Sequence, residues 1–387
     1  MTDAPRPFRI ALPDARLAWI RDGLARAEYP PQPQGDRDWR YGIDVGYLRN
    51  FVRYWLDAYD WRRAEAALNR FPQFIAEVEG IDLHFYHVKG SGSRPFPLIL
   101  THGWPGSVFE FLHLVETLCF PERFGGNPEE GFDLVIPSLP GMGFSAPPPA
   151  PIGPRRIARL WRKLMTEVLG YPCFGAQGGD FGSAIGQWLG TDHADVVLGA
   201  HFNLVTLPLS QDPGIGAAER EWQATYRRVI KRHGAYMLQH MAKPQTVAVV
   251  LSASPVACAA WILEKFQAWG DTGGNIESRF SKDQMITNLM FYLAGSGAGT
   301  AIWLYNGVAQ EHARGESDGL KVTCPTAVAE FPKEFIPYPS RDAVARYYNL
   351  QRWTVMPSGG HFAALEEPEA FCADVRAFFL GVRQRTS

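Results

Sequence analysis

Residues 178–182 read Gly-Gly-Asp-Phe-Gly, and the stretches on either side give this short motif its meaning. Residues 172–176 predict a short buried strand, and residues 183–189 predict an amphipathic helix that begins with small residues. A strand, a tight turn and a helix in this order form a nucleophile elbow. Because the turn strains the backbone of its central residue, small neighbours are needed on both sides. The outer glycines of the motif meet that need, and the central residue is Asp180.

An aspartate occupies the position where the usual elbow has a serine. A serine alkoxide that attacked an sp³ carbon bonded to oxygen or halogen would leave an ether, which water does not readily cleave. A carboxylate that attacks the same carbon leaves an ester, which an activated water can hydrolyse. An aspartate elbow therefore indicates an epoxide or an alkyl halide as substrate. The alternative is that Asp180 only caps the following helix, and spacing alone does not decide between the two.

Three ionisable residues follow predicted strands in the order nucleophile, acid, base. Asp180 follows the strand before the elbow, Glu334 follows a strand at 324–330, and His361 follows a strand at 352–356. This is the chain order of the α/β-hydrolase fold. The sequence therefore predicts that Asp180, Glu334 and His361 meet at one edge of a mostly parallel sheet.

Two of these assignments have competitors nearby in the chain. Glu330 lies four residues before Glu334, and Asp342 lies eight residues after it, so either carboxylate could be the acid. His102 ends a buried strand at 96–102 and begins a His-Gly-Trp-Pro-Gly turn, where the α/β-hydrolase fold places one oxyanion donor. We expect His102 to shape this turn and not to act as the base.

The alternation of predicted strands and helices, and its absence in places, divides the chain into four parts. Residues 1–88 contain helices rich in aromatic residues and a hairpin, which we expect to pack on the main domain. Residues 89–205 form the first part of an α/β core. Residues 206–318 lose the alternation of strands and helices and predict a helical lid. Residues 319–387 return to that alternation and complete the core.

The composition excludes several classes of protein. Of the 387 residues, 46% are hydrophobic, which is enough for a large core. The net charge of −2 gives no support for a nucleic-acid or anionic-membrane partner. No stretch predicts a membrane span, and residues 248–263 are interpreted as one buried helix. The five cysteines show no pairing pattern, so we expect a cytoplasmic protein. The ten histidines show no metal-binding spacing, and no cofactor is expected.

Taken together, the motifs resemble those of the microsomal-type epoxide hydrolases over nearly the whole chain. The likeness lies in the oxyanion turn at 102–106, the elbow at 178–182, the acid segment at 331–334, the histidine loop at 358–364 and the N-terminal region around 39–62. Phe331 and Pro332 place Glu334 in the register of the family's acid. Mammalian members begin with a membrane anchor; this chain does not, so it resembles the soluble bacterial and fungal members.

The resemblance implies a two-step reaction with an epoxide and water as the partners. Asp180 attacks the epoxide, and the family's two lid tyrosines correspond to Tyr236 and Tyr305, which hold and protonate its oxygen. His361, oriented by Glu334, then activates water. The resemblance also implies that the backbone N–H groups of Trp104 and Phe181 stabilise the oxyanion. It leaves a homodimer open.

Two other functions compete with this one. A haloalkane dehalogenase shares the aspartate elbow, and Trp104 could then stabilise the halide, but the tyrosine pair would have no use. A catalytically silent binding protein could use the same pocket. The complete set of acid, base and nucleophile argues against it, because unused buried charges are costly.

Overall fold

The computed structural model describes residues 4–35, 39–210, 215–295 and 297–386. Within these residues the strands form a nine-stranded sheet of order β1-β2-β3-β5-β4-β6-β7-β8-β9. The strands are β1 (Arg6–Phe8), β2 (Gln73–Val78), β3 (Ile81–Val88), β4 (Phe96–Thr101), β5 (Phe132–Pro137), β6 (Phe174–Gly178), β7 (Val197–Phe202), β8 (Val322–Glu330) and β9 (Tyr348–Val355). The β1-β2-β3-β5 pairs are antiparallel, and the pairs from β5 to β9 are parallel.

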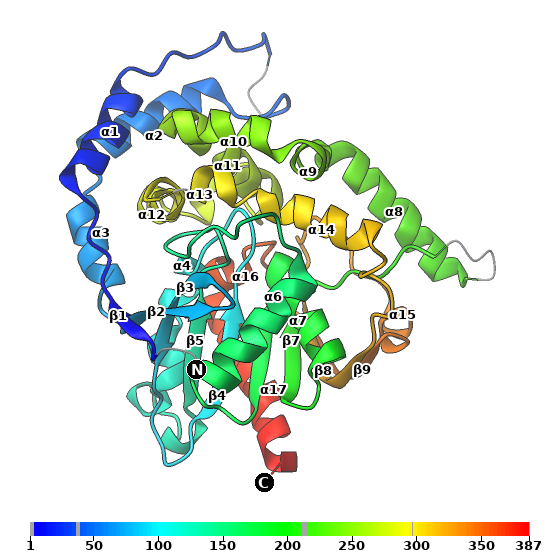
Figure 1. Ribbon diagram of the computed structural model, residues 1–387. Helices are drawn as coiled ribbons and strands as arrows, with labels where there is room; N and C mark the ends of the chain where they lie inside the picture. The colour runs from blue at the N-terminus through cyan, green and yellow to red at the C-terminus, as the bar shows by residue number, and fades with distance from the viewer. Residues whose placement is uncertain (1–3, 36–38, 211–214, 296, 387) are drawn as a thin grey trace.

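Helices cover both faces of the parallel part of the sheet, as its apolar strands require. All six residues of β5 are buried, and so are all five of β6. Helices α6 (Pro154–Lys163) and α7 (Asp180–Asp192) lie in front of the sheet in Figure 1, and α17 (Pro368–Thr386) lies behind it. Shorter helices complete the core: α4 (Phe109–Leu112), α5 (Val115–Cys119), η1 (Pro121–Phe124), η2 (Pro128–Glu130), η3 (Leu164–Val168), α15 (Arg341–Ala345) and α16 (Ala363–Glu366).

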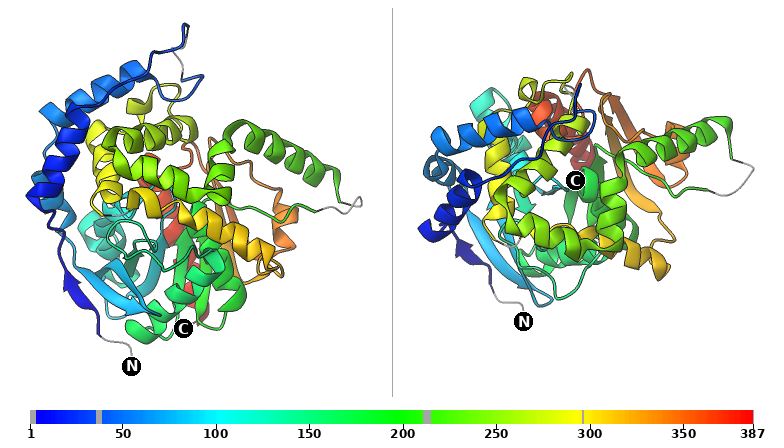
Figure 2. Two further views of the ribbon diagram at one scale, coloured as in Figure 1. Left: turned by 45° about the horizontal axis from the view of Figure 1, so that its top comes forward. Right: turned by 90° about the horizontal axis from the view of Figure 1, so that it is seen from above.

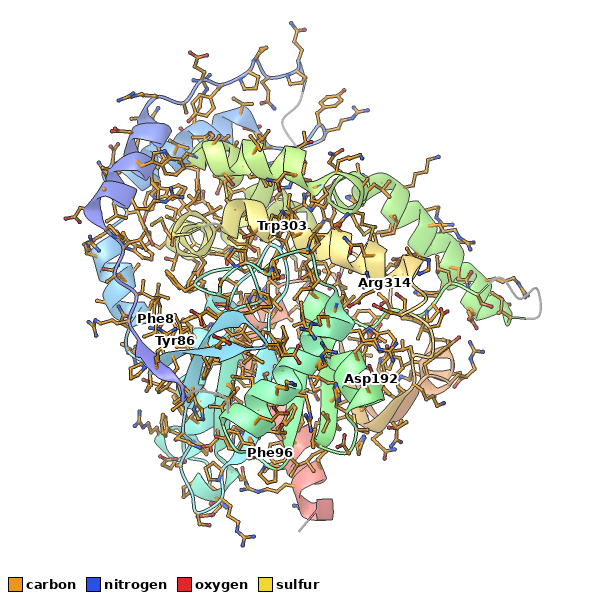
Figure 3. The ribbon with its side chains drawn as sticks, viewed as in Figure 1. Phe8, Tyr86, Phe96, Asp192, Trp303 and Arg314 are labelled. Atoms are coloured by element: carbon orange, nitrogen blue, oxygen red, sulfur yellow. The ribbon has the colours of Figure 1, made fainter. Side chains whose placement is uncertain are left out.

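A layer of helices between β7 and β8 covers the carboxyl ends of the parallel strands (Figures 1 and 2). These helices, called the lid below, are α8 (Ala217–His233), α9 (Ala235–Ala242), α10 (Pro244–Ala253), α11 (Pro255–Trp269), η4 (Ile276–Ser278), α12 (Lys282–Leu293), α13 (Gly297–Thr300) and α14 (Trp303–Ala313). Figure 3 places Trp303 and Arg314 at the two ends of α14, with Phe96, the first residue of β4, at the far end of the sheet. The lid therefore covers the edge where loops that follow parallel strands meet.

Residues 248–263 are helical, as the sequence predicts, but the helix is broken in two. The segment belongs to two helices, α10 and α11, which meet at a bend of 116°. Pro255 has no backbone N–H to continue α10, and the Ser254 side chain accepts a hydrogen bond from the Ala257 N–H to begin α11. Among the described residues, no single helix is long and apolar enough to cross a membrane.

The N-terminal helices run along one side of the molecule and reach the lid (Figure 1). They are α1 (Asp14–Ala25), α2 (Val45–Asp57) and α3 (Trp61–Leu68). The Arg16 Nε donates to the Leu293 carbonyl at 2.7 Å, and the hydroxyls of Tyr59 and Thr287 are 2.9 Å apart. Both contacts end on α12 of the lid, so the N-terminal segment joins the lid to the antiparallel edge of the sheet.

Candidate active site

The turn between β6 and α7 holds Asp180 in a strained backbone conformation. Its φ angle is +48°, in the left-handed region that side chains other than glycine rarely adopt. Close packing makes the turn possible, because a Cβ on Gly178 would overlap the Gly182 backbone and a Cβ on Gly182 would overlap the Thr101 carbonyl. These two glycines let β4, β6 and α7 approach one another, and the turn presents the Asp180 carboxylate at the sheet edge.

His361 lies between the carboxylates of Glu334 and Asp180. Its Nδ1 is 2.9 Å and 3.0 Å from the two oxygens of Glu334, and its Nε2 is 3.4 Å from Asp180 Oδ2. The side chain of Glu334 is 1% exposed and that of His361 is 4% exposed, so this contact is shielded from water. The structure thus brings together the three residues that the sequence placed after three separate strands.

The two competing acids do not contact His361. A Glu330 oxygen accepts a hydrogen bond from the Trp353 Nε1 at 2.6 Å, on the neighbouring strand β9. Asp342 is exposed at the start of α15. Of the three carboxylates considered, Glu334 is the one whose side chain reaches the histidine.

The protonation of His361 depends on both neighbours. Burial acts to lower its pKa, but the charges and hydrogen bonds of Glu334 and Asp180 outweigh burial and raise the pKa well above its usual value. His361 therefore carries a proton when Asp180 is an anion. If Asp180 loses its charge, one of the two groups that hold this proton is lost as well.

A backbone N–H group reaches the other oxygen of Asp180. The Trp104 N–H donates to Asp180 Oδ1 at 2.9 Å. Phe181 follows Asp180 in the first turn of α7, so its N–H belongs to the end of a helix where donors lack partners within the helix. His102 stabilises the turn before Trp104: its Nδ1 is 2.9 Å from the Gly103 carbonyl oxygen, and its Nε2 accepts from the Leu139 N–H. Burial lowers the pKa of His102 to about 4, so it is neutral.

Tyr236 and Tyr305 approach the site from two different lid helices, α9 and α14. Their rings meet edge-on with centroids 5.7 Å apart, and each phenol is close enough to affect the pKa of the other. The ring of Tyr236 stacks on Trp104, and the ring of Tyr305 meets Phe181 edge-on at 4.7 Å. Burial, together with the nearby charge of Asp180, raises the pKa of both phenols, so both keep their protons at neutral pH.

Several residues beside the tyrosines gave no signal in the sequence. The Lys265 Nζ lies 4.7 Å from the centroid of the Tyr236 ring, and the His240 ring is 4.9 Å from that of Tyr305. Burial lowers the pKa of His240 to about 3, with Lys265 acting in the same direction. Trp269 packs against His361 at 5.0 Å. These side chains come from α9 and α11, and only the folded lid brings them to the site.

A cavity of about 730 Å³ opens onto Asp180 beneath the lid. Both tyrosines line it, and most of its remaining surface is apolar, with Met237, Val308 and others from the lid. A cavity of this size and polarity suits an apolar organic molecule. In the part of the chain that the structure describes, no group of three or more His, Cys, Asp or Glu side chains could hold a metal ion.

Comparisons with known proteins give a consistent result over the whole chain. The family model "Epoxide hydrolase N terminus" matches residues 5–111. A putative epoxide hydrolase of Stigmatella aurantiaca is 37% identical, and the match covers 98% of this chain and 86% of that protein. Epoxide hydrolase 1 of Oryctolagus cuniculus is 34% identical, with 98% and 89% covered.

Solved structures agree with the sequence relatives. The epoxide hydrolase of Aspergillus niger superposes with a TM-score of 0.86 at 32% identity, and the match covers 98% of this chain and 97% of that one. The juvenile hormone epoxide hydrolase of Bombyx mori gives a TM-score of 0.88 at 26% identity, with 100% and 96% covered. The predicted α/β-hydrolase fold is confirmed by these structures.

Proposed function

Because the chain belongs to the epoxide hydrolases, we propose that it opens its epoxide through a covalent ester on Asp180. The observation that carries this proposal is the placement of the two Asp180 oxygens. Oδ1 accepts a hydrogen bond from the Trp104 N–H, Oδ2 faces His361, and the lid cavity begins at the same carboxylate. Asp180 is thus held as a nucleophile is held, with its orientation fixed and its reactive face toward the substrate.

In the first step an Asp180 oxygen bonds to an epoxide carbon while the ring C–O bond breaks. The electrons of that bond go to the epoxide oxygen, which takes a proton from the pair formed by Tyr236 and Tyr305. A phenol suits this role, because it is protonated at neutral pH and can donate to a developing alkoxide. The product of this step is a neutral ester.

In the second step water attacks the carboxyl carbon of Asp180. Ester formation removes the negative charge of Asp180, so His361 loses one of the groups that raised its pKa. It gives up the proton it held, which restores the tyrosine that protonated the epoxide, and its Nε2 can then accept a proton from water. Glu334 retains and orients the imidazolium that forms. The oxyanion is held by the N–H groups of Trp104 and Phe181, and each such donor contributes about 3 kcal/mol. Collapse of the tetrahedral intermediate breaks the ester C–O bond, and the leaving oxygen takes a proton from the His361 imidazolium to give the diol. The Asp180 carboxyl then returns its proton to His361, which restores the starting charges.

The lid cavity indicates the class of epoxide. Its volume of about 730 Å³ and its lining of Met237, Met241, Leu207 and Val308 favour a bulky apolar epoxide over a small polar one. Diol formation from a series of alkyl and aryl epoxides of increasing size measures this preference.

A single turnover in ¹⁸O water tests the covalent route. With enzyme in excess over epoxide, the oxygen first added to the substrate comes from Asp180. The diol should therefore be mostly unlabelled, and the peptide that contains Asp180 should carry the label. If water attacked the epoxide directly, the diol would be labelled and the peptide would not.

A further inference from the structure

A buried lysine lies over the ring of Tyr236. Lys265 belongs to α11, and its Nζ is 4.7 Å from the centroid of the Tyr236 ring. The same Nζ is 5.5 Å from the ring of Trp261 and 5.9 Å from that of Trp269. Tyr236 lines the lid cavity, whereas Lys265 is not among the described residues that line it. Lys265 is therefore placed to act on a bound epoxide through the tyrosine ring and not by touching it.

The packing of α11 does not by itself require a lysine at this position. The side chain of Lys265 is 10% exposed, and its acidic partner is the preceding residue, Glu264, whose side chain is 27% exposed. The other buried residues of α11 are apolar, among them Ile262, Leu263 and Phe266. Lysine is rarely buried, and an apolar residue of similar volume often packs as well or better. A buried cation beside the tyrosine pair thus points to a role in the site.

A cation over the ring matters most when the tyrosine gives up its proton. Proton transfer from the Tyr236 hydroxyl leaves a phenolate, and part of its negative charge spreads into the ring. The cation attracts this charge more strongly than it attracts the neutral phenol, and the attraction is large where water is excluded. An interaction that is stronger in the transition state than in the ground state accelerates the step.

Tyr305 has different neighbours. Its ring lies 4.7 Å from that of Phe181 and 4.9 Å from that of His240. His240 is neutral, because burial and the nearby charge of Lys265 lower its pKa to about 3. The two phenols also act on each other in opposite directions, since Tyr305 acts to lower the pKa of Tyr236 and Tyr236 acts to raise that of Tyr305. The surroundings thus favour ionisation of Tyr236 over that of Tyr305.

We propose that Lys265 makes Tyr236 the proton donor of the tyrosine pair, while Tyr305 only holds the epoxide oxygen; this assignment rests on the covalent route proposed above. As an Asp180 oxygen bonds to the epoxide carbon, the ring C–O bond breaks and its electrons go to the epoxide oxygen. That oxygen takes the hydroxyl proton of Tyr236, and the phenolate forms beside the Lys265 ammonium. Tyr305 keeps its proton and donates a hydrogen bond to the same oxygen. The proton that His361 later gives up restores Tyr236.

The substitution Lys265→Met tests this role, because methionine keeps most of the side-chain length but has no charge. Rapid mixing with an epoxide, followed by quenching and mass spectrometry, measures ester formation and ester hydrolysis separately. Ester formation should fall by about 3- to 30-fold, the scale of a desolvated cation–π contact, and hydrolysis should stay within about 2-fold of the parent rate. Lys265→Arg keeps a cation that stacks on aromatic rings, so it should restore most of the rate.

Combination with each tyrosine variant tests whether Lys265 acts through Tyr236. In the Tyr236→Phe background no phenolate can form at this ring, so Lys265→Met should change ester formation by less than about 2-fold. In the Tyr305→Phe background Lys265→Met should slow ester formation by the same factor as in the parent. A lysine that merely supported the lid would slow both backgrounds alike and would lower the urea concentration at which the protein unfolds.

Lys282→Met is the matched control. Lys282 belongs to the lid helix α12, and its Nζ lies 5.5 Å from the centroid of the Tyr54 ring. Neither Lys282 nor Tyr54 is among the described residues that line the lid cavity. Both rates of this variant should match those of the parent.

The outcomes separate the role of Lys265 from the role of the tyrosines. If Lys265→Met forms the ester at the parent rate, or if it slows Tyr236→Phe as much as it slows the parent, Lys265 does not act on Tyr236. If Lys265→Met does not fold, Lys265→Gln is measured in its place. If the variant that lacks both tyrosine hydroxyls forms the ester at the parent rate, the tyrosines do not protonate the epoxide, and the assignment of Lys265 fails with that step.

Discussion

At the scale of single residues, the charge of Asp180 determines when His361 can act as a base. In the free protein, Glu334 and Asp180 together raise the pKa of His361 despite its burial. Esterification of Asp180 removes one of these anions and leaves Glu334, 2.9 Å from Nδ1, to orient the ring. In the proposed route, the electrostatics therefore set the order of the two steps, because the base becomes available only after the nucleophile has reacted.

The substitution His361→Gln should stop the reaction at the ester. Asp180 and both lid tyrosines remain, so ring opening continues, but no group takes the proton from water. Mass spectrometry after mixing with an epoxide should show the protein mass plus one substrate mass, with no diol beyond the first turnover. Steady diol production by this variant would contradict the role of His361.

The substitution Glu110→Gln should change how stability depends on pH. Burial raises the pKa of Glu110 in the folded protein to about 8 from its usual 4.5. Because the folded pKa is the higher one, the stability that this group contributes is fully present below pH 4.5 and is lost as the pH rises to 8. Glutamine has no charge to bury, so Glu110→Gln should gain stability relative to the parent between pH 5 and pH 8.5. Urea unfolding at both pH values measures this, and parallel pH profiles would contradict it.

At the scale of elements, two lid helices contribute the groups that we propose as the proton donors to the epoxide. Tyr236 lies in the first turn of α9 and Tyr305 in the first turn of α14, and their rings meet edge-on at 5.7 Å between the two helices. Their position therefore depends on the packing of the lid, whereas the position of Asp180 depends on the sheet.

Loss of one tyrosine hydroxyl should weaken ring opening, and loss of both should nearly abolish it. Tyr236→Phe and Tyr305→Phe each leave one donor, so each should reduce the rate of ester formation by about 10- to 100-fold, within the range of general acid catalysis. The double variant should form almost no ester. Tyr41→Phe, at an exposed residue, is the control and should match the parent. Parent-like ester formation by the double variant would mean that another group protonates the epoxide.

Two glycine substitutions test the packing of the elbow. Gly182→Ala places a Cβ against the Thr101 carbonyl of β4, and neither backbone can move without disturbing the sheet. It should reduce the free energy of unfolding by more than about 3 kcal/mol. Gly381→Ala adds a methyl group to α17 where there is open space, and it should stabilise the protein by up to about 1 kcal/mol. Equal effects in urea unfolding would mean that the close approach at Gly182 does not limit stability.

At the scale of the whole molecule, the N-terminal segment joins the lid to the core. Arg16 and Tyr59 both bond to α12, while β1 of the same segment pairs with β2 at the edge of the sheet. The lid is thus held at its attachment to the core and also from the side, which keeps the tyrosines over the elbow.

Removal of both bonds should loosen this connection. The double variant Arg16→Met and Tyr59→Phe keeps most of the side-chain volume. It removes the bonds to Leu293 and Thr287 together with a longer one from Arg16 to the Gly295 carbonyl, and it should lose about 1–3 kcal/mol of stability. Arg21→Met, which removes a bond within the N-terminal segment to the Leu56 carbonyl, should cost less. Urea unfolding measures the loss of stability in both variants. An equal loss would mean that the bonds to the lid stabilise the protein no more than a bond within the N-terminal segment does.

The fold and the order of the three site residues can be predicted from the sequence, because both depend on patterns within short segments. A motif of glycines around Asp180 requires a strand, a turn and a helix, and the order of Asp180, Glu334 and His361 requires the α/β-hydrolase sheet. The fold and the family predicted in this way are confirmed by the comparisons. Pro255 is a local signal for the break between α10 and α11, but the size of the bend depends on how the two helices pack.

Only the tertiary structure decided which groups face each other across the site. Spacing left Glu330 and Asp342 open as acids, and the distance from Glu334 to His361 separates them. Nothing in the sequence alone indicates that Glu110 lies beside Asp180 and His361, since that placement depends on the close approach at Gly106 and on a cavity formed by segments far apart in the chain. The physical reason is that motifs record backbone needs within a few residues, whereas burial, charge and cavities arise from segments hundreds of residues apart.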